Sequence, residues 1–403
     1  MRQLGLVLAA LVLLVQILKG LSVETSLYPL LGTLFTYADG PVRRALLSSI
    51  LSLSGVTGLK AVGGALANLH IILMTVLAGA LLGRMTQLRF PADRLRLYLL
   101  WLVLASAVLP VLAVLTGYVD VLLVLGLMVL SGLLAEGYLL AASLILLTLG
   151  LQHEMAFVFG FCLFAGEALL NPAQRKPVLL ALAAVMIPAI GYLVLTAHYQ
   201  PELVHLTETR CALMRPAQHP LVSVVWDKYC TRQMTASVAS DFTPWRLIIL
   251  PVYLLVYGLL PLALAVIAFI EMRRTGCYRQ GLALLALMVL PLGLVSIAWD
   301  TDRIIILSSV AGWLLLDRWL ALAPPKAISL SAAVPVGLLV ILQLALAYPA
   351  VDAYGQRRVI PPALEKAYLF DMRQAALPVL QHYNLAMPVF LDPATCIDSR
   401  CAR

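Results

Sequence analysis

The sequence predicts an all-α polytopic membrane protein. Of its 403 residues, 62% are hydrophobic and only 12% are charged, with a mean hydropathy of +0.96. Soluble domains carry about twice that charged fraction. Apolar runs long enough to cross a bilayer as helices recur along the whole chain. The alternation of apolar and polar residues that is typical of membrane barrels is absent. These observations favour a bundle of transmembrane helices.

About 11 segments are predicted to span the membrane. They cover residues 4–21, 61–83, 97–117, 119–135, 138–152, 155–170, 178–197, 246–270, 282–299, 304–319 and 327–347. The three between 119 and 170 are short, and one span with a re-entrant pair would fit the same stretch. The first segment follows Arg2 as a signal peptide would. However, its apolar run is longer than usual and no small-residue cleavage site precedes Glu24, so we interpret it as a retained helix.

The orientation follows from the loops that are rich in lysine and arginine. These loops hold Arg84, Arg89, Arg94 and Arg96, then Arg175 and Lys176, then Arg273, Arg274 and Arg279. The positive-inside rule makes this face cytoplasmic, which puts the N-terminus inside and the C-terminus outside. The prediction is a bacterial inner-membrane protein. Its transmembrane domain covers 1–347, with exoplasmic loops 22–60 and 198–245, and a small exoplasmic tail covers 348–403.

The net charge of +8 would suggest a nucleic acid partner in a soluble protein, but here it reflects the loops, so no nucleic acid is expected. Six cysteines test the orientation independently. Cys211 and Cys230 share one predicted exoplasmic segment, and Cys396 and Cys401 share the other. Two local pairs in an oxidising compartment favour disulfides, and the spacing does not support a structural zinc site. Cys162 and Cys277 are expected to be free.

The first loop contains a compact polar stretch, Thr36-Tyr-Ala-Asp-Gly-Pro-Val-Arg-Arg44. Asp39 followed by Gly-Pro is typical of a helix start. An amphipathic pattern then predicts an interfacial helix from 41 to 53, with Arg43 and Arg44 leaving its first turn. The helix would hold Asp39 at the mouth of the spans. The alternative is an ordinary interfacial helix whose arginines contact lipid phosphates.

Three further polar features fall on the same predicted outer face. His153-Glu154 joins two apolar spans, where it suits proton transfer or phosphate binding, or forms a wetted turn. Asp300-Thr-Asp-Arg303 offers an arginine for bidentate phosphate binding, and Asp300 and Asp302 could hold Mg²⁺ or Mn²⁺ or simply pair with Arg303. His70 is either a donor to the phosphate or a satisfied interhelical hydrogen bond.

A carboxylate base, arginines and a histidine beside apolar helices suit a lipid-linked phosphosugar. The lipid tail needs hydrocarbon, the phosphate needs arginine, and an acceptor hydroxyl needs a carboxylate to take its proton. The phosphate-binding loop of nucleotide hydrolases, the serine-hydrolase elbow and the His-Glu-x-x-His zinc motif are all absent.

This arrangement resembles the GT-C class of integral-membrane glycosyltransferases, which have one span followed by a long exoplasmic loop with an early acid and juxtamembrane helices. The Tyr-Ala-Asp-Gly-Pro-Val-Arg-Arg, His-Glu and Asp-Thr-Asp-Arg elements are also similar to those of bacterial envelope-polysaccharide membrane proteins. The resemblance implies that Asp39 is the catalytic base, and that Arg43, Arg44 and Arg303 bind the donor phosphate. It further implies a polyprenyl-phosphate-linked sugar donor and a glycan, lipid or protein acceptor.

Other functions fit parts of the same pattern. A polymerase or ligase of lipid-linked glycans could use the same arginines and histidine. A flippase or transporter would place polar residues along a path through the membrane rather than at one face, and no inverted repeat is evident. An assembly scaffold has little need for such a cluster.

Overall fold

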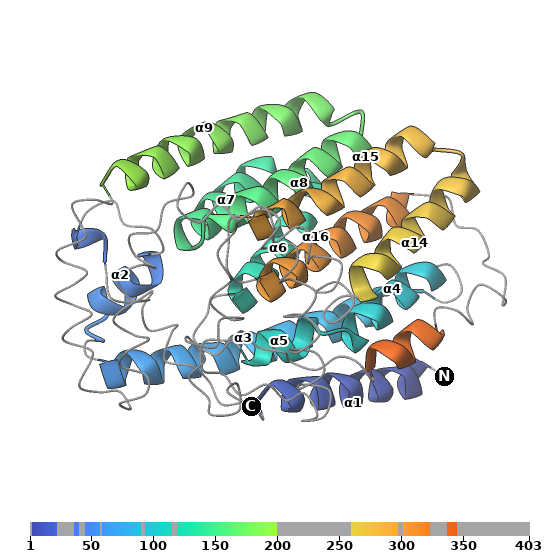
Figure 1. Ribbon diagram of the computed structural model, residues 1–403, viewed down its shortest axis with the longest axis horizontal. Coiled ribbons are helices and arrows are strands. Elements are labelled where there is room, and N and C mark those ends of the chain that lie inside the picture. Colours follow the sequence, from blue (N-terminus) through green and yellow to red (C-terminus); the bar gives the residue numbers. More distant parts are fainter. Residues whose placement is uncertain are drawn as a thin grey trace, which may run out of the picture.

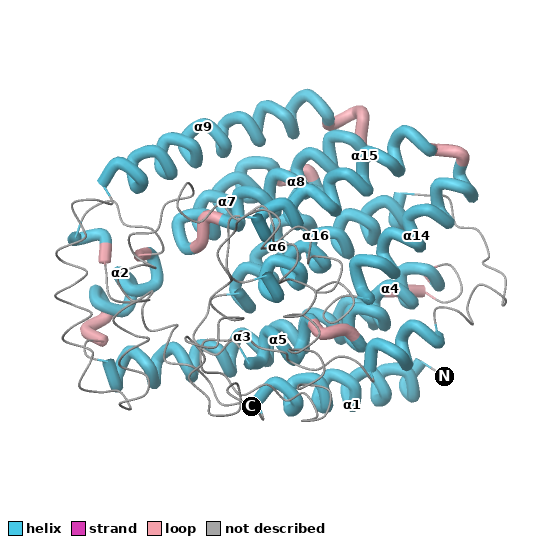
Figure 2. Tube along the Cα trace, viewed as in Figure 1, coloured by secondary structure: helices cyan, strands magenta, loops and turns pink. Residues whose placement is uncertain are grey.

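The computed structural model describes residues 2–21, 36–39, 45–56, 59–89, 93–114, 120–199, 259–296, 301–322 and 337–344. These residues form helices and their connections, without a β-strand among them (Figure 2). The predicted all-α class is therefore confirmed for the described part of the chain. Four helical stretches are long and apolar enough to cross a membrane: Ala65–Gln87, Arg175–Tyr199, Tyr278–Val295 and Arg303–Leu322.

The helices follow the predicted apolar segments closely. They are α1 (Arg2–Leu21), α2 (Leu46–Leu53), α3 (Leu59–Gln87), α4 (Arg94–Ala105), α5 (Val108–Val114), α6 (Asp120–Glu136), α7 (Leu139–Gln152), α8 (Met155–Leu170), α9 (Arg175–Tyr199), α14 (Leu259–Thr275), α15 (Tyr278–Val289) and α16 (Thr301–Leu322). The 3₁₀ turns η2 (Tyr37–Asp39) and η5 (Leu290–Ser296) and a helical segment at 337–344 complete the described elements. Residues 120–170 form three separate helices that contact one another.

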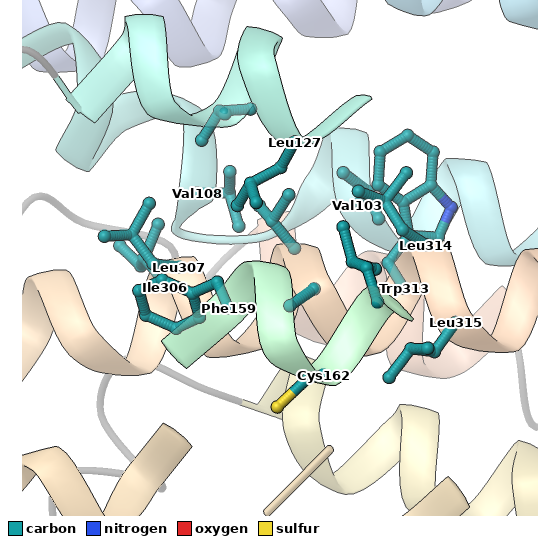
Figure 3. Close-up of a cluster of buried hydrophobic side chains, with 14 of the residues drawn as sticks. Val103, Val108, Leu127, Phe159, Cys162, Ile306, Leu307, Trp313, Leu314 and Leu315 are labelled. Atoms are coloured by element: carbon teal, nitrogen blue, oxygen red, sulfur yellow. The ribbon is translucent and has the colours of Figure 1, made fainter. Parts of the chain in front are cut away.

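Helix α16 lies at the centre of the bundle, between α4, α6, α8, α14 and α15 (Figure 1). Neighbouring helices surround it, and 83% of an 18-residue stretch within Arg303–Leu322 is buried inside the protein. Figure 3 shows Trp313 and Leu314 of this helix near Val103 of α4, whereas Leu315 lies apart from them, toward Gly166 of α8. Helix α9, by contrast, exposes most of its apolar surface along one edge of the bundle, as a lipid-facing helix would.

Helices α7 and α8 form a tight hairpin that positions the turn between them. Gly150 faces the ring of Phe157 so closely that an added Cβ would lie 2.1 Å from the ring. Gly160 on α8 faces Leu146 in the same way, with a distance of 2.2 Å. A larger residue at either position would have to displace a packed side chain. The turn at His153-Glu154 is therefore held by packing on both sides.

The predicted span 97–117 is broken near its middle, between α4 and α5. Ser106 has an extended backbone (ψ 175°), and Pro110 lacks the N–H that would bond to the Ser106 carbonyl. The Nε2 of Gln16 on α1 donates to the carbonyls of Ala105 (2.8 Å) and Ser106 (3.3 Å). With its amide nitrogen toward Leu102, Gln343 donates to that carbonyl at 2.7 Å. Two glutamines from other helices thus satisfy carbonyls that the break exposes.

The two ends of the bundle carry different polar groups. The arginine end holds Asp317 on α16, which pairs with Arg84 of α3 and Arg96 of α4. The next residue, Arg318, pairs with Glu167 of α8 at 2.8 Å. The opposite end, called the α2 end, carries α2, η2, the α7–α8 turn and the start of α16 (Figure 1). The bundle therefore separates the two groups of polar residues as the predicted topology does.

Candidate functional site

The centre of the α2 end is a buried ion pair between Arg303 and Asp120. Arg303 lies in the first turn of α16, and Asp120 is the first residue of α6. Nε of Arg303 donates to Oδ2 of Asp120 at 2.7 Å, and Nη2 donates to Oδ1 at 2.8 Å. The side chains are only 3% and 1% exposed. Two parallel charge-assisted hydrogen bonds fix the plane of the guanidinium and satisfy both charges inside the protein.

His153 contacts this pair from the α7–α8 turn. Its Nε2 lies 3.3 Å from Nη2 of Arg303, and the imidazole is 2% exposed. The backbone holds the residue in place, because its N–H donates to the Leu149 carbonyl (2.7 Å) and its carbonyl accepts from Ala156 (2.9 Å). The neighbouring Glu154 is 20% exposed, and its Oε2 lies 3.8 Å from Nδ1 of His153. The predicted His-Glu pair therefore joins Arg303 in one cluster.

The η2 turn of the first loop docks beside the same turn. The Tyr37 hydroxyl donates to the Leu151 carbonyl at 3.2 Å, and the Tyr37 N–H donates to Oγ of Ser49 on α2 at 2.8 Å. Helix α2 is anchored in turn by Gln152, whose Oε1 accepts from the Leu47 N–H at 2.8 Å. Burial raises the pKa of Tyr37, and an interaction with the Tyr192 side chain partly offsets this. The first loop and the His153 turn thus form one surface.

Asp39 lies half-buried in this docked turn. Its Oδ2 accepts hydrogen bonds from the N–H (2.9 Å) and the hydroxyl (3.4 Å) of Thr36, and its backbone carbonyl accepts from the Tyr199 hydroxyl (3.2 Å). The carboxylate therefore stabilises its own turn, as aspartates often do. This geometry fixes Asp39 at the α2 end and gives its carboxylate a structural role in addition to the predicted catalytic one.

His70 lies in α3, with 3% of its surface exposed. Its Nε2 is 3.2 Å from the Ala113 carbonyl at the end of α5, and its Nδ1 has no hydrogen-bond partner among the described residues. A histidine donating to a backbone carbonyl between two helices is the structural alternative that the sequence offered. Its role as a phosphate ligand stays a prediction.

Several predicted residues lie outside the described part of the chain. They are Arg43, Arg44, Asp300, Cys211, Cys230, Cys396 and Cys401, together with the side chain of Asp302. The metal and disulfide predictions that rest on them are therefore untested. Within the described ranges, His, Cys, Asp and Glu do not gather in groups of three that could hold a metal ion. Cys162 and Cys277 are free thiols, as the sequence predicted.

The cluster at the α2 end combines the partly exposed Glu154, the buried His153 and the fixed guanidinium of Arg303. Such a set can accept a proton, donate hydrogen bonds to an anion and stabilise negative charge at the edge of an apolar bundle. The sequence prediction missed Asp120, the residue that holds Arg303. One signal pointed to it: Asp120 is an isolated acid at the start of an apolar segment, where an ionised side chain needs a partner.

Comparisons with known protein families, curated proteins and solved structures gave no match to this chain.

Proposed function

We propose that this chain is an integral-membrane glycosyltransferase of GT-C type that moves a sugar from a polyprenyl-phosphate-linked donor to a glycan, lipid or protein acceptor. The observation that carries the proposal is the gathering of His153, Glu154, Arg303 and the Tyr37–Asp39 turn at one end of an apolar bundle. The lipid tail of the donor would lie between apolar helices, and its phosphate would lie at the polar end.

The full topology belongs to the same proposal. The chain would cross the bacterial inner membrane about 11 times, with its arginine end in the cytoplasm and its α2 end in the periplasm. The exposed arginines and lysine of the α8–α9 and α14–α15 connections support this orientation, since short cytoplasmic loops carry an excess of such residues. No nucleotide is available in the periplasm, so the energy of transfer would come from the lipid-linked donor itself.

In the proposed reaction, the oxygen of an acceptor hydroxyl attacks the anomeric carbon of the donor sugar. The new carbon–oxygen bond forms while the bond from that carbon to the phosphate oxygen breaks, and its electron pair leaves with the polyprenyl phosphate. The hydroxyl proton passes to a carboxylate, for which Asp39 and Glu154 are the candidates. Cationic and hydrogen-bonding groups stabilise the charge that develops on the leaving phosphate. Arg43 and Arg44 are the predicted residues for this role.

The test is transfer of a labelled sugar from purified polyprenyl-phosphate donor by the full-length protein in liposomes. Asp39→Asn and Glu154→Gln should each lower the turnover number, and loss of the base should cost on the order of 100-fold. Asp93→Asn is the matched control, because Asp93 lies at the arginine end and pairs with Arg96. Full activity in both variants of the α2 end would contradict the assignment.

Transport of a lipid or solute is a second candidate, favoured by one observation. Buried polar groups occur near the middle of the bundle, at the α4–α5 break beside Gln16 and Gln343, and not only at the α2 end. Broken helices at such depth are typical of transporters. Movement of a labelled lipid across the membrane of proteoliposomes without a covalent product would favour this reading over transfer. Accumulation of single glycan repeats in a deletion strain would instead indicate a polymerase.

A further inference from the structure

Arg303 is held more rigidly than a single ion pair requires. Its Nε and Nη2 both donate to the carboxylate of Asp120, and both residues are almost fully buried. A guanidinium bound along one edge cannot rotate without breaking two hydrogen bonds at once. The direction in which Nη2 points at His153 is therefore set by Asp120.

The contact between Arg303 and His153 restricts the histidine. Arginine has no acceptor and keeps its proton in proteins, so the nitrogen that faces Nη2 at 3.3 Å must accept. That nitrogen is Nε2. A neutral imidazole has one acceptor and one donor, which leaves the ring proton on Nδ1. A proton on Nε2 would place two hydrogen-bond donors, Nε2–H of His153 and Nη2–H of Arg303, against each other in a buried site.

Among the described residues, one backbone contact favours the other tautomer. The N–H of Met155, at the start of α8, lies 3.4 Å from Nδ1 of His153 and would donate to it if Nδ1 were unprotonated. This is a long bond from a first-turn N–H, of the kind that commonly has no partner inside a helix. Losing it costs less than a donor–donor contact with an arginine in a buried site, where electrostatic interactions are strong. The Nδ1–H tautomer of His153 should therefore be the more stable one.

We propose that Asp120 is a positioning residue: it orients Arg303, which fixes His153 in the Nδ1–H tautomer, with that proton on the side of Glu154. In the proposed transferase, on which this consequence rests, His153 then acts as a hydrogen-bond donor through Nδ1 and not as the base. Its Nε2 is occupied by Arg303 and its Nδ1 is already protonated. The proton of the acceptor hydroxyl must go to a carboxylate, and His153 can orient Glu154 or donate to a substrate oxygen.

The direct test is nitrogen-15 solid-state NMR of the full-length protein in liposomes, labelled at histidine. His153→Asn and His70→Gln variants assign the two buried rings by loss of signal. His70 is an internal control, since its Nε2 donates to the Ala113 carbonyl and its neutral ring should be protonated at Nε2. We expect His153 to show the opposite tautomer, protonated at Nδ1. A His153 ring protonated at Nε2 in the unmodified protein would overturn the proposal.

Variants separate positioning from simple stability. Asp120→Asn keeps the side-chain shape but removes the charge that holds Arg303, so His153 should no longer show a single tautomer. Asp120→Glu should restore it, at least in part. If folded Asp120→Asn protein keeps His153 in the Nδ1–H form, then Asp120 does not position it. The measurement on the unmodified protein stands even if Asp120→Asn fails to fold.

Sugar transfer gives a second readout that can fail separately. Asp120→Asn should lower the turnover number on the order of 100-fold with little change in KM, as expected for a misplaced group beside the reacting atoms. His153→Asn should retain more activity than His153→Ala, because the asparagine amide can replace the Nδ1 donor. An Nδ1–H tautomer in a protein that transfers no sugar would contradict the proposed function and leave the positioning role intact. Sugar transfer by a protein whose His153 is protonated at Nε2 would support the proposed function and contradict the positioning role.

Discussion

At the scale of single residues, Arg303 shows how a predicted ligand acquired a structural partner. The sequence singled it out as a guanidinium near two neighbouring aspartates, whereas the structure pairs it with Asp120, 183 positions away in the chain. The local sequence could not reveal this partner, because it depends on how α6 packs against α16. The pair makes the guanidinium of Arg303 a fixed part of the site.

Replacing one partner of this ion pair should lower the stability of the protein strongly, whereas replacing both partners should lower it much less. Asp120→Ala or Arg303→Ala leaves one buried charge alone, which costs about 3–5 kcal/mol. Replacing both with apolar residues, Asp120→Leu with Arg303→Met, should cost less than either single change. Thermal unfolding of the detergent-purified protein measures this. Arg279→Ala, at an exposed position of the arginine end, is the control. A double variant less stable than both single variants would contradict the pairing.

Tyr37 makes a second prediction, through pH. Burial raises the pKa of Tyr37 above 10.0, and its hydroxyl donates to the Leu151 carbonyl. Below pH 10 the phenol is protonated in the folded and the unfolded chain, so its contribution to stability is complete. As the pH rises, the unfolded chain loses this proton first, and the contribution disappears through the higher pKa of the folded state.

The difference in melting temperature between the native protein and Tyr37→Phe should therefore shrink from about pH 9 to about pH 11. The hydrogen bond itself contributes on the order of 1 kcal/mol at the lower pH. Tyr138→Phe, at an exposed turn between α6 and α7, is the control for removing a phenol hydroxyl. A difference for Tyr37→Phe that stays constant over this range would contradict the raised pKa of Tyr37, and the absence of any difference at about pH 9 would contradict the contribution of the Leu151 bond.

At the scale of the elements, the apolar pattern predicted most helices well and missed one feature. The predicted spans 138–152 and 155–170 nearly coincide with α7 and α8. The break between α4 and α5 lies inside a predicted span, because its cause is a combination: Pro110 removes a donor and glutamines from other helices satisfy the exposed carbonyls. Hydropathy reports how apolar a segment is, but not where a distant side chain can replace a helical hydrogen bond.

The side chain of Gln16 should therefore contribute to the stability of the protein, because it donates to the carbonyls at the α4–α5 break. Gln16→Leu leaves the Ala105 and Ser106 carbonyls without their donor inside the bundle, which should cost about 1–3 kcal/mol. Gln3→Leu is the matched control, since Gln3 is an exposed glutamine of the same helix. Melting temperatures of the two purified variants provide the comparison. Equal stability of both would mean that the carbonyls do not depend on Gln16.

At the scale of the whole molecule, the separation of polar groups into two ends is the feature that the sequence predicted best. Loop charges alone grouped Arg84 and Arg96 at one face and His153 and Arg303 at the other, and the helix contacts agree. Charges in short connections report the direction of each span, so the grouping needs no knowledge of packing. The compartment that each end faces stays a prediction.

Cys277 offers a native probe of that orientation. It is an exposed free thiol in the turn between α14 and α15 at the arginine end. In a variant that keeps only Cys277, a membrane-impermeant maleimide should label inside-out vesicles and spare right-side-out ones. A variant with Ser54→Cys as its sole cysteine, exposed at the end of α2, should behave in the opposite way. Labelling of both positions from one side would contradict the topology.

If the α2 end binds the phosphate of a polyprenyl-linked donor, a density map of the protein with bound polyprenyl phosphate will show it there. We expect phosphate density within hydrogen-bonding distance of the surface formed by the Tyr37–Asp39 turn, His153-Glu154 and the start of α16, with the lipid tail between apolar helices. Phosphate density at the arginine end, beside Arg84 and Arg96, would contradict it.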